Sequence, residues 1–291
     1  MRPLKTRVKR LQGLALKPIT SQEAAIIQMQ QLQLKLQYQQ LYTAGAALPS
    51  YRDVGFRLFS GEEEDGILLY LLAIVGSGDK HLVDVGACGL SGSNSANLLI
   101  NQGWTGLLIE GNPESLAANR AEYEARGVPA PTLVSAWVAE DNVDKLIAEH
   151  CPKGADLLFI DIDGNDYWVW KAIDSISPRI VVIEYQDILG PVRSATIPYD
   201  PKFFRDQYPE NANHMNYGGA SLSAMVKLGA SKGYRLVATN LRGYNAFFVR
   251  QDLAPEALPE IPVEAGLQHA WNEYGMRERW PLVSHLPWVE V

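Results

Sequence analysis

The stretch HLVDVGACGLSGSNS, residues 81–95, decides the fold of this chain. It begins with a short apolar run typical of a buried strand, and glycines follow at positions 86, 89 and 92. Glycines permit a sharp turn and a close approach of the backbone to a ligand, and short polar residues suit a helix N-terminus. The stretch therefore predicts a strand, a glycine-rich turn and a helix, in that order.

The same alternation of strand and helix continues as far as residue 250. Further apolar runs predict strands at 106–111, 131–138, 155–164, 179–186, 234–240 and 245–250. Helical stretches lie between most of them, at 113–126, 141–150, 167–176 and 221–232. Strands that are apolar on both faces predict an α/β fold with a doubly wound, mostly parallel, seven-stranded sheet between helix layers. A short glycine-containing link joins the last two runs, so we expect a C-terminal antiparallel hairpin.

Two further segments flank this region. Residues 21–42 consist of strong helix formers, and a second helix begins in the acidic run at 62–65. We therefore expect a basic tail and helical arm over 1–57, a Rossmann-like domain over 58–250 and a C-terminal extension over 251–291. The arm is expected to pack on the domain; a contact between two copies of the chain, giving a homo-oligomer, is the alternative.

Composition excludes several classes of protein. The 291 residues carry a formal net charge of -7, which disfavours nucleic acid as a partner. With only two cysteines the chain shows neither a disulfide framework nor a zinc motif, so we expect a cytoplasmic protein. The longest apolar run, 67–75, is shorter than the about 20 residues that span a membrane. Residues 1–10 are basic, but no apolar signal segment follows them, so a solvated tail is favoured over a transit peptide.

Two acidic residues at the predicted sheet edge suit a nucleoside. Ligands of such sheets bind at the carboxyl ends of the strands. We expect Asp84 within the first turn and Glu110 at the carboxyl end of the second strand, where a carboxylate can accept both hydroxyls of a ribose. The glycine spacing is not that of a dinucleotide site. The alternative for Glu110 is a solvated carboxylate at a strand end.

The motifs DVGACGLSGSNS, LLIEGN, FIDIDGND and VVIEY together resemble the class I S-adenosylmethionine-dependent methyltransferases, and among these the FkbM family. The resemblance covers roughly residues 58–250, and it implies S-adenosylmethionine as cofactor. The residues implied to bind this cofactor are Asp84, Gly86, Ala87, Cys88, Gly89, Ser93, Asn94, Glu110, Gly111, Asn112, Ser135, Ala136, Trp137 and Asp161. The chain departs from the family at Cys88, where asparagine is more common, and in the stretch 161–166.

The densest polar cluster follows the predicted strand 155–164. Asp161 and Asp163 lie there, and Glu184 ends the neighbouring strand, so the three carboxylates are expected to converge. They could hold Mg²⁺ or another divalent cation, and we expect Asp161 and Asp163 to take part in catalysis. The alternative is that the acids of 161–166 only cap the helix that follows.

Residues 187–219 lack a regular period but are rich in aromatic residues, which predicts a binding lid. His214 in this segment is a further catalytic candidate. The family resemblance implies O-methyl transfer to a small-molecule acceptor, either a glycan or a natural product. Two other functions stay open at this point. One is a metal-dependent glycosyltransferase with the D-x-D pattern 161–163, and the other is a catalytically silent binding or oligomerisation module.

Overall fold

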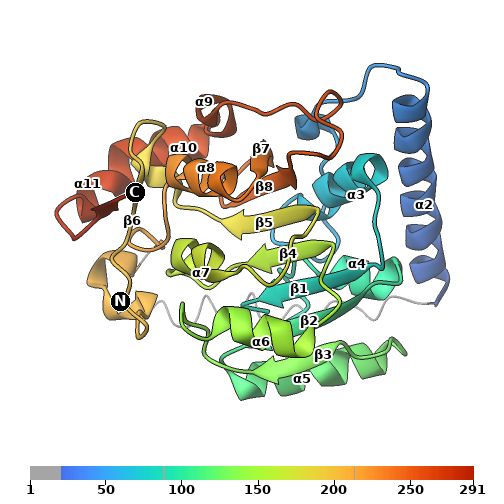
Figure 1. The fold of residues 1–291 in the computed structure, drawn as a ribbon, viewed down its shortest axis with the longest axis horizontal. Helices are drawn as coiled ribbons and strands as arrows, with labels where there is room; N and C mark the ends of the chain where they lie inside the picture. Colours follow the sequence, from blue (N-terminus) through green and yellow to red (C-terminus); the bar gives the residue numbers. More distant parts are fainter. Residues whose placement is uncertain (1–20, 88, 213) are drawn as a thin grey trace, which may run out of the picture.

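The computed structural model describes residues 21–87, 89–212 and 214–291. The expected basic tail and Cys88 lie outside the described residues. A seven-stranded sheet forms the centre of the molecule (Figure 1), in the order β3-β2-β1-β4-β5-β8-β7. Its strands are β1 (His81–Val85), β2 (Thr105–Glu110), β3 (Thr132–Ser135), β4 (Leu157–Ile160), β5 (Ile180–Glu184), β7 (Tyr234–Thr239) and β8 (Asn245–Arg250).

The predicted fold class is confirmed. Strands β1 to β5 pair in parallel, and β8 pairs antiparallel with both β5 and β7. Strand order reverses between β1 and β4, because the chain first builds outward to β3 and then returns to the other side of β1. In open sheets of this kind, the crevice at that reversal is where ligands bind.

Helices cover both faces of the sheet. One core cluster packs α3 (Glu64–Val75) and α4 (Ala96–Asn101) against one face, and a second packs α6 (Val143–His150), α7 (Asp166–Ala172) and α8 (Leu222–Ser231) against the other. Neighbouring residues of β1 alternate between the clusters, with Leu82 in the first and Val83 in the second. This alternation explains why the buried strands are apolar throughout. Helix α5 (Pro113–Ala125) lies along β2 and β3.

Helix α2 (Ser21–Thr43) packs against α3 and α4 at the edge of the molecule, in blue in Figure 1. Tyr38 meets the ring of Tyr70 edge-on at 5.2 Å, and the buried Gln31 exchanges side-chain hydrogen bonds with Asn97. The opposite side of α2 exposes four large apolar side chains, those of Ile26, Met29, Leu32 and Leu36. The arm therefore packs on the domain, and the contact between two copies stays a prediction.

The C-terminal segment packs on the lid segment, residues 187–219. It contains α9 (Val263–Gly266), α10 (Ala270–Tyr274), a π-helix η5 (Gly275–Arg279) and α11 (Trp280–Val283). A two-stranded sheet joins β6 (Ala195–Thr196) to β9 (Val289–Glu290), and 3-10 turns occur at Tyr51–Asp53, Asp187–Leu189, Arg205–Gln207 and Pro209–Asn211. Val283 shares a third core cluster with Ile188, Phe203 and Tyr217 of the lid segment. No helix among the described residues is both long and apolar enough to cross a membrane.

The two acids in the first turn of α3 also form hydrogen bonds to groups outside the helix. The Asp65 carboxylate accepts hydrogen bonds from the backbone N–H groups of Leu58, Phe59 and Ser60. The Glu64 carboxylate accepts from the side-chain amides of Asn240 and Asn245. Both acids are buried, so they hold the segment before α3 against the sheet edge.

Candidate functional site

Two adjoining cavities lie at the carboxyl ends of the central strands. The first has a volume of about 330 Å³ and extends over the ends of β1, β2 and β4. The second has a volume of about 290 Å³ and reaches from β4 to β5 and β8. The residues that line both are Gly92, Asn94, Asp161, Asp163 and Arg205. A ligand in one cavity is therefore a direct neighbour of a ligand in the other.

Most of the residues predicted to bind the cofactor line the first cavity. They are Asp84, Gly86, Ala87, Ser93, Asn94, Glu110, Gly111, Ala136, Trp137 and Asp161. Gly89, Asn112 and Ser135 do not line it, and Cys88 is not described. Asn112 instead caps α5, since its side-chain oxygen accepts from the backbone N–H of Glu114 at 2.9 Å. Ser135 ends β3 and is the register partner of Glu110.

Asp84 and Glu110 are held by local hydrogen bonds. The hydroxyl of Ser95 donates to Asp84 Oδ2 at 2.5 Å, and the backbone N–H of Asn112 donates to Glu110 Oε1 at 2.7 Å. Asp84 lies within β1 rather than in the turn after it, and it is buried. Burial raises the pKa of Asp84 to about 6, although the hydrogen bond from Ser95 opposes the shift. Glu110 is half-buried at the cavity wall.

Gly86 brings the turn after β1 into contact with the turn after β4. Its φ is 95°, and a Cβ atom at this position would lie 1.8 Å from the carbonyl oxygen of Asp161. Only glycine fits there, because any side chain would collide with backbone. The close approach places Asp161 in the wall of the cavity that also contains Asp84.

Asp161, Asp163 and Glu184 converge as predicted. One carboxylate oxygen from each lies within 4.8 Å of the other two. Burial raises the pKa of Asp161 and of Glu184 well above the ordinary carboxyl range, and the neighbouring acids raise both further. Glu184 is 9% exposed, and its Oε2 atom has no hydrogen-bond partner within the described part of the chain. The cluster therefore favours a proton or a cation in its centre.

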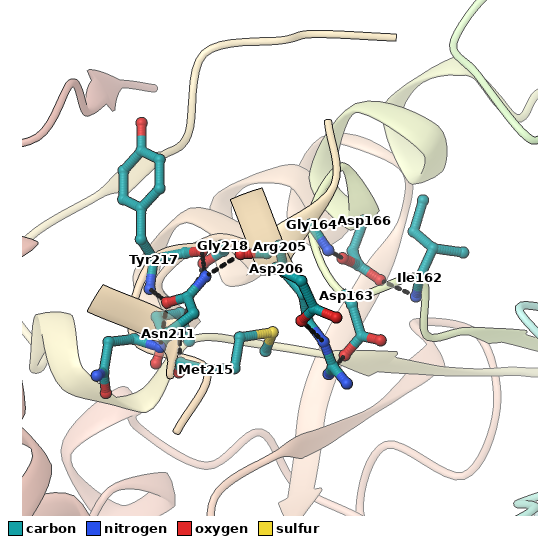
Figure 2. A network of polar contacts seen from close by, with 12 residues as sticks. Ile162, Asp163, Gly164, Asp166, Arg205, Asp206, Asn211, Met215, Tyr217 and Gly218 are labelled. Atoms are coloured by element: carbon teal, nitrogen blue, oxygen red, sulfur yellow. Dashed lines mark hydrogen bonds and ion pairs between the residues drawn. The ribbon is translucent and has the colours of Figure 1, made fainter. Parts of the chain in front are cut away.

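Asp166 has a different role from its neighbours. Its carboxylate accepts from the backbone N–H groups of Ile162 and Gly164, both at 2.9 Å, as Figure 2 shows. These bonds close the turn between β4 and α7 and leave Asp161 and Asp163 as cavity-lining residues. Asp166 therefore closes the turn before α7 rather than capping that helix, and burial raises the pKa of this group to about 6.

Sequence reasoning missed Arg205. It lies in the 3-10 turn Arg205–Gln207 of the lid segment, and its Nη1 atom is 2.5 Å from Asp163 Oδ1 (Figure 2). Its Nε atom is also 3.4 Å from the carboxylate of Asp206. The arginine lines both cavities and supplies positive charge at the edge of the acidic cluster. No local pattern links residues 205 and 163, so only the path of the lid segment reveals the pair.

The second cavity is completed by residues from distant parts of the chain. His214 lines it as an exposed side chain, with its ring edge-on to Trp271 at 5.4 Å. Asn245 is the register partner of Glu184 across the β5–β8 pair. Arg279 is buried and forms an ion pair with Asp187. The structure thus brings His214 to the same cavity as the three carboxylates, and sequence reasoning missed Asn245 and Arg279.

Comparison with known proteins identifies similar structures only. No protein-family model matches the sequence, and no curated protein matches it. The magnesium protoporphyrin IX methyltransferase from Synechocystis PCC 6803 with bound S-adenosylmethionine is 11% identical, with a TM-score of 0.41 over 64% of this chain and 77% of that chain. An O-methyltransferase from Bacillus cereus in complex with S-adenosylhomocysteine is 17% identical, with a TM-score of 0.42 over 83% and 95%. At these identities the similarity concerns the fold alone.

Proposed function

We propose that this chain is an S-adenosylmethionine-dependent O-methyltransferase that acts on a hydroxyl of a glycan or natural-product acceptor. The observation that carries the proposal is the pair of adjoining cavities at one sheet edge. The first contains the Asp84 and Glu110 carboxylates, and the second contains Glu184 and His214. Asp161 and Asp163 line both, which is where a donor and an acceptor would meet.

The first cavity fits the proposed cofactor in size and in chemistry. Its volume of about 330 Å³ is within the range of small-molecule sites. Glu110 would accept hydrogen bonds from the ribose hydroxyls. The buried Oδ1 atoms of Asn94 and Asn165 have no partner among the residues described, so both can accept hydrogen bonds from a ligand. When bound, S-adenosylmethionine supplies a methyl group that is activated by its positively charged sulfur.

The three carboxylates fit a divalent cation. Hard cations such as Mg²⁺ prefer carboxylate oxygens, and Asp161, Asp163 and Glu184 offer three of them within 4.8 Å of one another. The buried Oε2 atom of Glu184 has no hydrogen-bond partner among the described residues, so it can coordinate a cation. We propose that these residues hold the cation, which would polarise the acceptor hydroxyl.

The chain itself must then align the acceptor and manage its proton. The wall shared by the cavities positions the acceptor oxygen toward the first cavity, which lowers the entropic cost of an in-line transfer. Asp161 and Asp163 are the carboxylates at that wall, and they or the neighbouring His214 would accept the hydroxyl proton.

Calorimetry with three kinds of ligand tests the proposal. We expect S-adenosylhomocysteine to bind to the full chain, and UDP- and GDP-sugars not to bind. Binding of a nucleotide sugar in its place would favour the D-x-D glycosyltransferase. A folded chain that binds none of these ligands would favour the silent binding module. Release of S-adenosylhomocysteine from S-adenosylmethionine with a panel of polyol acceptors then identifies the acceptor.

A further inference from the structure

One part of the lid segment lines the first cavity and is held there by three contacts. We call residues 200–206 the strap. The indole N–H of Trp137, after β3, donates to the carbonyl of Pro201 at 2.8 Å. The side-chain amide of Asn165, after β4, donates to the carbonyl of Asp200 at 2.7 Å. At the other end, Arg205 reaches Asp163. The strap is therefore tied to the residues that follow β3 and β4, and its residues 203–206 line the first cavity.

Two consecutive phenylalanines of the strap have opposite environments. Phe203 is 6% exposed, belongs to the third core cluster and stacks on Tyr208 at 5.5 Å. It lies so close to Gly164 that a Cβ atom there would be 2.3 Å from its ring. Phe204 is 53% exposed, although it lines the first cavity. Phe203 thus fixes the strap to the domain, whereas about half of the Phe204 side chain is exposed at the cavity.

Trp137 is a second uncovered aromatic side chain in the same cavity. It is 56% exposed and lines the cavity together with Phe204. The Cβ position of Gly111 lies 3.0 Å from the Trp137 ring, so the indole lies beside the residue that follows Glu110. Trp137 therefore offers an apolar face next to the carboxylate proposed for the ribose.

We infer that Phe204 is a second aromatic wall for the purine ring of the cofactor, in the same cavity as Trp137, which the family resemblance already implies as a cofactor residue, so that the strap is part of the cofactor site. The inference rests on the proposed function. A purine attached to a ribose at Glu110 would lie beside Trp137, and the strap would present Phe204 to it. Stacking of a base on aromatic side chains is a strong and geometrically tolerant interaction, which suits a wall on a loop. It also leaves the second cavity for the acceptor.

Calorimetry with S-adenosylhomocysteine tests this assignment. We expect Phe204→Ala and Phe204→Leu to bind it about tenfold more weakly than the unchanged chain. Phe204→Tyr keeps the aromatic face and should bind within about twofold of it. The control is Val192→Ala, which removes an exposed apolar side chain from the lid segment outside the first cavity. Because Phe204 is exposed, all variants should fold, and circular dichroism with a thermal midpoint checks this.

Trypsin provides a second measurement. Arg205 follows Phe204 directly, so cleavage after Arg205 reports on the strap. We expect S-adenosylhomocysteine to slow this cleavage in the unchanged chain and not in Phe204→Ala. If Phe204→Ala binds S-adenosylhomocysteine as tightly as the unchanged chain and is protected from trypsin to the same extent, while Glu110→Ala binds it more weakly, the inference is wrong and the proposed function still stands. If the unchanged chain does not bind S-adenosylhomocysteine, the proposed function fails and the inference fails with it.

Discussion

The carboxylates of the two cavities differ in how the protein satisfies them. Asp84 and Glu110 each accept a hydrogen bond from a residue nearby in sequence, Ser95 and Asn112. In the acidic cluster, Glu184 Oε2 has no partner among residues 21–87, 89–212 and 214–291, and Asp163 is paired only through the distant Arg205. The first set is thus oriented by local structure before any ligand arrives. The second set is left with excess negative charge, which a cation from outside the chain would balance.

Removal of divalent cations should have the largest effect, because it acts on the acidic cluster and leaves the Asp84 and Glu110 carboxylates unchanged. We expect exhaustive EDTA treatment to abolish methyl transfer, and Mg²⁺ or Mn²⁺ to restore it, while the affinity for S-adenosylhomocysteine stays nearly constant. Electron paramagnetic resonance of bound Mn²⁺ gives a readout that needs no acceptor, and Glu184→Gln should lose that signal. Full activity in the presence of chelator would mean that the carboxylates act as bases or structural groups instead.

The pH dependence of stability should detect the burial of Asp84. Its folded pKa of about 6 is above the unfolded value of 3.8, so its contribution to stability is complete below pH 3.8 and is lost as the pH rises through 6. Asp84→Asn avoids this loss and can still accept from Ser95. The free energy of unfolding of Asp84→Asn, relative to the unchanged chain, should therefore rise by about 2 kcal/mol between pH 4 and pH 8. Parallel urea-unfolding profiles across this range would contradict the prediction.

Glu110→Ala should weaken ligand binding in the first cavity without affecting cation binding in the second. We expect the affinity for S-adenosylhomocysteine to fall by roughly 1 to 3 kcal/mol, the cost of losing charged hydrogen bonds to a bound partner. Mn²⁺ binding should not change. Glu122→Ala, which removes an exposed carboxylate from α5 outside the cavity, is the matched control. An unchanged affinity in folded Glu110→Ala would remove this residue from the site.

Arg205→Met should have the smallest effect of these changes. It should alter only the cation affinity of the acidic cluster. Removing a positive charge that is paired with Asp163 should tighten Mn²⁺ binding by roughly threefold to tenfold, since both side chains are partly exposed and solvent screens the interaction. Lys202→Met, an exposed cation on the same strap, is the control and should leave Mn²⁺ affinity unchanged. Weaker Mn²⁺ binding in Arg205→Met would show that the arginine helps to build the site.

Much of the sheet edge could be predicted because its pattern is local. Burial on both faces makes β1, β2, β4 and β5 apolar, and the residues at their ends mark one edge of a parallel sheet. That rule is enough to bring Asp161 and Glu184 together, although 23 positions separate them in sequence. The glycine-rich turn predicts a glycine at position 86, but not that a Cβ atom there would collide with the backbone of Asp161.

The sequence by itself determined the order of strands and helices, the parallel sheet and the acids at its edge, because hydrophobic period and glycine turns act over a few residues. The tertiary structure decided which residues of the irregular segments reach that edge. Phe203 and Phe204 are adjacent, chemically identical and both at the first cavity, yet Phe203 is buried and Phe204 is exposed. Their difference depends on how a loop without regular hydrogen bonding crosses the sheet edge, and that path is set by contacts such as Trp137 with Pro201 and Arg205 with Asp163.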